Sequence, residues 1–142
     1  MYNSFGKSLT EFAYFIERIS IVTKEFLNRL NNSNEFYNLI YKIYKSSQSI
    51  NYEFIKLCYS VRADENLTID LSEMDNISIP VTRIKTIDEF KKFINDSNKA
   101  LKNPLYFICE STKKYSLVLN KEIDSYINLI NDFNLKKTAD DL

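Results

Sequence analysis

The chain has 142 residues, 19 Lys+Arg against 19 Asp+Glu for a formal net charge of zero, no histidine, no tryptophan, one glycine and two cysteines. The missing histidine excludes Ser-His-Asp and Cys-His nucleophilic sites, histidine-bearing zinc sites and imidazole acid–base catalysis. The single glycine, Gly6, excludes the dinucleotide-binding and Walker A loops, which need several glycines where the backbone approaches a phosphate.

Length and charge also indicate a broad class. A chain of this size can bury a self-sufficient core, so one domain over residues 1–142 is expected. Zero net charge argues against a surface dominated by phosphate contacts.

Cys58 and Cys109 are far apart, lie among apolar neighbours and form no C-x-x-C motif, which favours buried, reduced thiols. With neither a signal-peptide pattern nor an apolar run of about 20 residues, we expect a cytoplasmic protein.

A helical hairpin is expected over residues 8–47. Ser8 and Glu11 match a capping box, which predicts the start of the first helix at that point. The short, polar junction at 31–34 predicts an antiparallel turn into a second helix that ends near Ser46. The apolar residues of the first helix recur at spacings of three and four: Leu9, Phe12, Ile16, Ile19, Phe26 and Leu30.

The segment 46–64 fits two structures. Ile50, Phe54 and Leu57 have helical spacing, but the apolar residues of 55–61 also alternate with polar ones, as they do in 67–71 beyond the polar turn 64–66. The matched alternation on both sides of one turn favours a β-hairpin.

The rest of the chain predicts further strands and two helices. Pro80 makes its strand an edge or bulged strand, and Thr86 with Glu89 forms a second capping box that predicts a helix start. The expected elements are a strand over 77–84, a helix over 86–101, a hairpin of strands 105–110 and 115–119, a helix over 121–133 and a flexible tail over 135–142.

The order of these elements predicts an α+β fold. The helical hairpin would be followed, over residues 52–134, by a mostly antiparallel sheet of about five strands covered by two further helices.

The densest acidic stretch lies on the expected hairpin. It is a solvated surface or an electrostatic docking surface for a basic protein, and it lacks the glycine and the alternating oxygen ligands of an EF-hand loop. The candidate residues are Asp64, Glu65, Asp70, Glu73 and Asp75.

Tyrosine is unusually abundant, with ten residues of 142. Tyr37, Tyr41 and Tyr44 fall at i, i+4 and i+7 of the expected second helix. Such a stripe forms the margin of a core, where each ring is buried and its hydroxyl stays wet, or it forms a protein-binding face.

Taken together, these features predict a protein that is not an enzyme, needs no cofactor or metal, and acts by binding another protein as an inhibitor, immunity protein, chaperone or adaptor does. The sequence does not identify this partner protein, and a second copy of the same chain, forming a homodimer, is one option. The alternative is a module that binds a small ligand or nucleotide, and a third option is single-stranded nucleic-acid binding, which the neutral charge disfavours. No membrane partner is expected.

Overall fold

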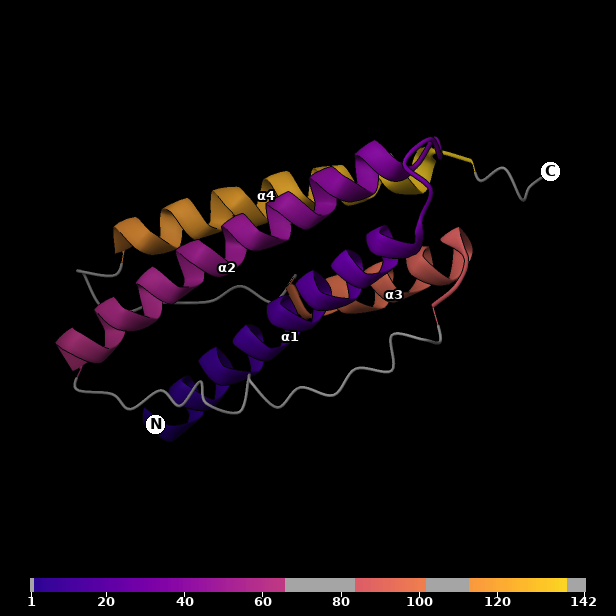
Figure 1. Cartoon of the computed structure of the whole chain (residues 1–142). Helices are drawn as coiled ribbons and strands as arrows, with labels where there is room; N and C mark the ends of the chain where they lie inside the picture. The colour runs from indigo at the N-terminus through magenta and orange to yellow at the C-terminus, as the bar shows by residue number, and fades with distance from the viewer. Residues whose placement is uncertain (1, 66–83, 102–112, 138–142) are drawn as a thin grey trace.

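The described part of the chain folds into four α-helices (Figure 1). The computed structural model describes residues 2–65, 84–101 and 113–137, with the side chains of 12–60, 84–98 and 117–137. The helices are α1 (Tyr2–Arg29), α2 (Tyr37–Glu65), α3 (Ile87–Leu101) and α4 (Lys113–Leu135). These residues contain no β-strand, so the fold is all-α and the expected α+β class is wrong.

Helix α2 continues through the residues expected to form the first strand. No glycine or proline lies between residues 37 and 65, so nothing in the sequence stops the helix. Its buried residues keep helical spacing to the end of the described side chains, with Ile43, Ile50 and Leu57 each fully buried. The apparent alternation arises because Ile55 is exposed on the outward face of the same helix.

The expected turn at 64–66 is also wrong, because Asp64 and Glu65 are the last two residues of α2. At the other end of the chain, the expected strand 115–119 lies inside α4, which begins at Lys113 and contains the whole of the expected helix 121–133. The buried residues of α4 recur at spacings of four and three: Leu119, Ile123, Tyr126, Ile130 and Phe133. The expected strands 67–71, 77–84 and 105–110 lie outside the described residues, apart from Ile84.

Local signals explain where two of the helices begin. The Oγ1 of Thr86 accepts a 3.1 Å hydrogen bond from the Glu89 backbone N–H, which confirms Thr86 as the N-cap of α3. The Glu89 carboxylate accepts a hydrogen bond from the Thr86 hydroxyl, in place of the Thr86 backbone N–H that it would bind in a standard capping box. Between α1 and α2, the Asn31 and Asn34 side chains accept hydrogen bonds from the backbone N–H groups two residues ahead. The capping box expected at Ser8 is wrong, since α1 already begins at Tyr2.

The helices form a bundle in which α1 contacts α2 and α3, and α4 also contacts α2 and α3. Arg29, the last residue of α1, donates a 2.9 Å hydrogen bond to the carbonyl of Ile84, just before α3. Lys136, just after α4, donates one to the carbonyl of Glu35, just before α2. The ends of α1 and α4 and the starts of α2 and α3 therefore meet at one end of the bundle (Figure 1). Because α2 starts at this end, its last residue, Glu65, lies at the opposite end of the bundle from the start of α3.

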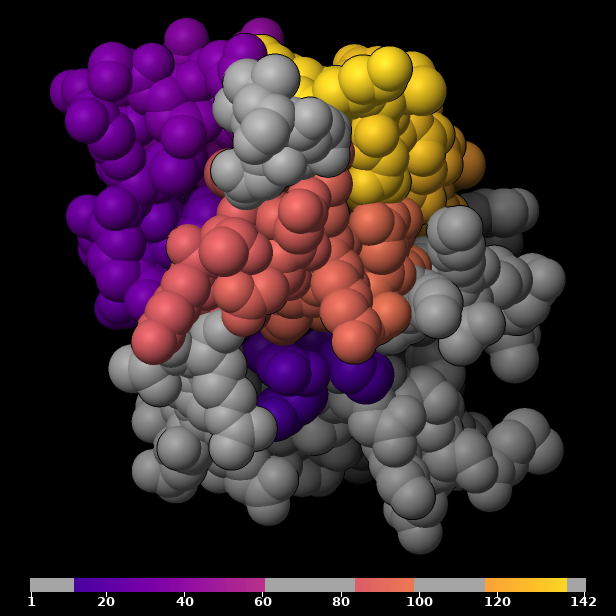
Figure 2. Space-filling model, turned by 90° about the vertical axis from the view of Figure 1, so that its right-hand side faces the viewer, coloured from indigo at the N-terminus to yellow at the C-terminus, as the bar shows by residue number. Residues whose placement is uncertain are grey.

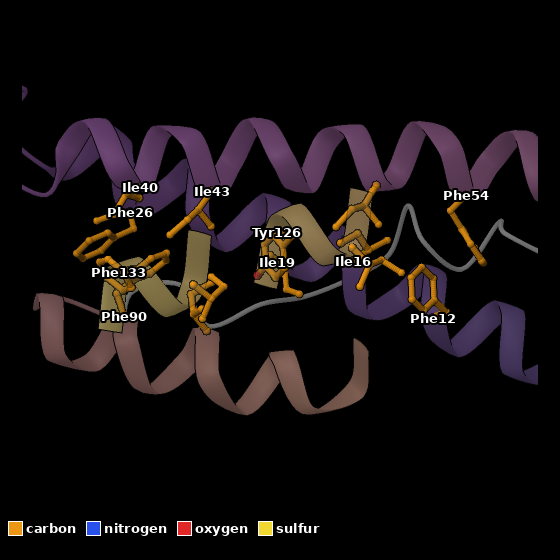
Figure 3. Close-up of a cluster of buried hydrophobic side chains, with 14 of the residues drawn as sticks. Phe12, Ile16, Ile19, Phe26, Ile40, Ile43, Phe54, Phe90, Tyr126 and Phe133 are labelled. Atoms are coloured by element: carbon orange, nitrogen blue, oxygen red, sulfur yellow. The ribbon is translucent and has the colours of Figure 1, made fainter. Parts of the chain in front are cut away.

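The core is one continuous apolar cluster with aromatic rings at both ends (Figure 3). Phe12 of α1 and Phe54 of α2 lie with ring centroids 4.6 Å apart towards one end. At the other end, Phe90 of α3 stacks on Phe26 of α1 at 4.7 Å and meets Phe133 of α4 edge-on at 5.8 Å. In the end-on view of Figure 2, α3 lies in front of α1 and beside the C-terminal end of α4. Aromatic contacts thus dock this short helix onto both of its neighbours.

Candidate functional site

Helix α2 has a second stripe of large side chains on its outward face. Relative exposure is 44% for Tyr41, 62% for Tyr52, 37% for Ile55 and 65% for Tyr59. With exposed Lys45 and Gln48 between them, the stripe follows a spacing of four and three residues, which keeps it on one side of a helix. We call these six residues the outward stripe: Tyr41, Lys45, Gln48, Tyr52, Ile55 and Tyr59.

The outward stripe borders a groove between α1 and α2, with a volume of about 400 Å³. The helices are held together beneath it by a buried 2.8 Å hydrogen bond between the hydroxyls of Ser20 and Ser47. The groove is lined from α1 by Glu17, Ser20, Ile21 and Lys24, and from α2 by Tyr44, Gln48, Asn51, Tyr52 and Ile55.

Acidic and basic side chains lie at different positions along the groove. Glu17 accepts a 3.2 Å hydrogen bond from the Asn51 side chain, whereas Lys24 lies seven residues further along α1. Because α1 and α2 are antiparallel, the level of Lys24 corresponds to that of Tyr44, near exposed Lys45. One end of the groove is therefore acidic on its α1 side and the other end is basic.

Two cations lie over tyrosine rings of the outward stripe. The Lys45 Nζ lies 5.6 Å from the centroid of the Tyr41 ring, and the Lys56 Nζ lies 4.3 Å from that of Tyr52. Lys56 also forms a 3.4 Å ion pair with Glu53. These contacts restrict the exposed rings, so less side-chain entropy remains to be lost when a partner covers them.

The three tyrosines singled out from the sequence divide between two environments. Tyr37 and Tyr44 are half-buried and pack against the core, and the Tyr44 hydroxyl accepts a 2.8 Å hydrogen bond from Gln48. Tyr41 is exposed and belongs to the outward stripe. The structure does not bring the three together as one exposed patch.

The acidic candidates fall mostly outside the described residues. Asp64 and Glu65 close α2, and their side chains are not among those described. Asp70, Glu73 and Asp75 lie in the segment 66–83, outside the described residues.

The sequence reasoning missed three residues of the outward stripe: Tyr52, Ile55 and Tyr59. The signal that could have found them is the regular step from Tyr41 through Lys45 and Gln48, which continues through all three. Interpreting residues 55–61 as a strand interrupted that step and hid the stripe.

Buried polar groups form a separate feature inside the bundle. Within the described residues, three buried side-chain oxygens have no hydrogen-bond partner: the hydroxyls of Thr23 and Tyr126 and the side-chain amide oxygen (Oδ1) of Asn98. Burial raises the pKa of Tyr126 above its ordinary value, because the phenolate would lose its hydration. Tyr126 therefore stays a neutral phenol at physiological pH.

No group of three or more His, Cys, Asp or Glu side chains that could hold a metal ion occurs in the described part of the chain. Over the same residues, none of the helices combines the length and apolar character needed to cross a membrane. Comparisons with protein-family models, curated proteins and solved structures find no match to the chain.

Proposed function

We propose that this protein acts without catalysis, by binding another protein through the outward stripe and the adjoining groove of α1 and α2. The observation that carries the proposal is the placement of Tyr41, Tyr52, Ile55 and Tyr59 on the outward side of one helix. Eight large hydrophobic side chains are exposed among those described, and these four share one stripe. Tyrosines that cluster at helical spacing are typical of protein interfaces, where a ring supplies area and a hydroxyl supplies a hydrogen bond.

The core does not need these side chains. The inward residues of α2 are buried, and they already pack against α1 and α4 within the apolar cluster. Apolar side chains that face water lower the solubility of a protein, and a partner that covers them removes this cost. A cytoplasmic location belongs to the same proposal and rests on the sequence grounds given above.

A photo-crosslinking residue at position 52 tests the proposal in the cells that produce the protein. Replacing Tyr52 by benzoylphenylalanine places the reactive ketone in the middle of the outward stripe. Asn131, exposed on α4, is the matched control position. We expect a discrete adduct of defined mass from position 52 and none from position 131. No adduct at position 52, or the same adducts at both positions, would contradict the proposal.

The groove itself supports a second candidate, a small-ligand site. Its volume of about 400 Å³ lies within the range of small-molecule pockets, and Glu17, Lys24 and Asn51 give it polar groups that could orient a ligand. A thermal-shift screen against nucleotides and metabolites separates the two candidates. A ligand that stabilises the wild type but not an Asn51→Ala variant would favour the small-ligand site.

A further inference from the structure

We infer that the partner of the outward stripe is a second copy of this chain, bound antiparallel with α2 against α2 about a two-fold axis. The inference rests on the proposed function and adds the identity of the partner. Alternating steps of four and three residues form the seam by which two helices pair side by side. Because a two-fold interface uses the same patch on both copies, that patch must be complementary to itself.

The charges of the groove supply this complementarity. Glu17 and Lys24 lie on the same row of α1, about 10 Å apart at 1.5 Å per residue. An antiparallel two-fold arrangement reverses one row against the other, so Glu17 of each copy faces Lys24 of the second copy. In a parallel two-fold arrangement with α2 against α2, the two α1 helices would lie on opposite sides of the seam, and neither Glu17 nor Lys24 would face α1 of the second copy. Among the described residues, neither side chain has an ion-pair partner within its own chain.

The same charges select the register. With the axis midway between Lys45 and Gln48, Tyr41 faces Tyr52 of the second copy, and Lys45 faces Gln48. Glu17 lies at the level of Asn51, to which it is hydrogen-bonded. In this register, Glu17 and Lys24 of the second copy are offset by only about 3 Å along the helix direction. Moving the two-fold axis to midway between Gln48 and Tyr52 would bring Glu17 of one copy opposite Glu17 of the second copy. The like charges disfavour that register.

The size of this face predicts a weak dimer. In this register α2 of one copy overlaps α2 of the other from Tyr37 to Lys56, a length of about 29 Å, and Tyr59 lies beyond the overlap. Two helices side by side are about 20 Å wide. Two copies therefore cover roughly 1,000 Å² in projection, at the lower end of specific interfaces. The dimer is expected to form at tens to hundreds of micromolar, and its contacts are expected to be reversible.

Sedimentation velocity on the full chain over that concentration range tests the inference through a charge exchange. Glu17→Lys and Lys24→Glu each turn two attractive pairs into two repulsive ones, so each single variant should weaken the dimer about tenfold or more. The double variant restores both pairs in the opposite sense and should return the dissociation constant to within about threefold of the wild type. Glu25→Lys, on an exposed α1 residue that does not line the groove, is the matched control and should leave the dimer intact. A thermal melt of each variant verifies that it is folded.

A wild type that stays monomeric throughout this range overturns the inference, as does a double variant that remains as monomeric as the single ones. If the chain is monomeric and the crosslinker at position 52 captures a different protein, the proposed function stands and the second copy is rejected. If position 52 captures nothing, both fail. Capture of the chain by itself, together with rescue by the double variant, supports both.

Discussion

Phe90→Ala is the substitution that best tests how α3 is held in the bundle. Phe90 is fully buried, stacks on Phe26 at 4.7 Å and meets Phe133 at 5.8 Å, so its ring joins α1, α3 and α4. Removing the ring leaves a hole whose walls belong to three helices. These helices cannot all move inward together, so the hole stays largely open.

The expected loss is about 3–5 kcal/mol in the free energy of unfolding, the range for a buried phenylalanine truncated to alanine. For 142 residues the unfolding entropy is about 0.3 kcal/mol/K, so the melting temperature should fall by about 10–17 °C. Urea unfolding followed by circular dichroism at 222 nm measures the free energy, and a thermal melt gives the second value.

Phe93→Ala is the matched control, because Phe93 lies on the same helix but is only half-buried beneath the guanidinium of Arg18, 5.3 Å from its ring centroid. Its expected loss is about 1 kcal/mol. If Phe90→Ala costs no more than Phe93→Ala, the docking of α3 by the aromatic cluster is refuted. An unchanged melting temperature in Phe90→Ala would lead to the same conclusion.

Two further predictions concern polar groups. Thr86→Ala removes the N-cap of α3 and should lower the free energy of unfolding by about 1 kcal/mol, while Thr86→Ser should retain most of it; equal losses in the two variants would contradict a role for the hydroxyl. Burial raises the pKa of Tyr126 above its ordinary value near 10, so above that pH the unfolded chain releases a proton that the folded protein keeps. This contribution to stability is fully present below pH 10 and is lost as the pH rises, by about 1.4 kcal/mol per unit. Tyr126→Phe removes the phenol, so its urea midpoint should fall less steeply than that of the wild type between pH 10 and 11. Parallel curves would show that Tyr126 is not the titrating group.

Part of the fold could be predicted because its signals are local. The N-cap at Thr86 and the asparagine turn after α1 depend on residues within four positions of each other, and both are confirmed. The strand predictions in α2 and α4 failed for a different reason. A helix with large side chains on opposite faces brings an apolar residue to nearly every second position over a short window, and such a window cannot separate a period of 2 from a period of 3.6. Only the longer run of buried positions from Ile43 to Leu57 distinguishes them.

The candidate site was predictable only in part. Tyr41 was selected together with Tyr37 and Tyr44, yet only Tyr41 faces outward, because the other two lie on the sides of α2 that pack against the core. Which face of a helix is covered depends on the packing of its neighbours, and no single-helix pattern contains that information. The groove depends on two helices at once. Glu17 and Lys24 line this groove only because α1 packs antiparallel against α2.

The two stripes of α2 separate folding from binding. The inward stripe consists of isoleucine, phenylalanine and leucine, which can be buried without any hydrogen-bond partner, as Ile50, Phe54 and Leu57 are. The outward stripe uses tyrosine in three of its six positions, and a tyrosine in water keeps its hydroxyl hydrated while the ring remains available for contact. Leucine at those positions would have favoured non-specific aggregation. Substitutions on the outward stripe should therefore change association without changing the free energy of unfolding, and substitutions on the inward stripe should do the reverse.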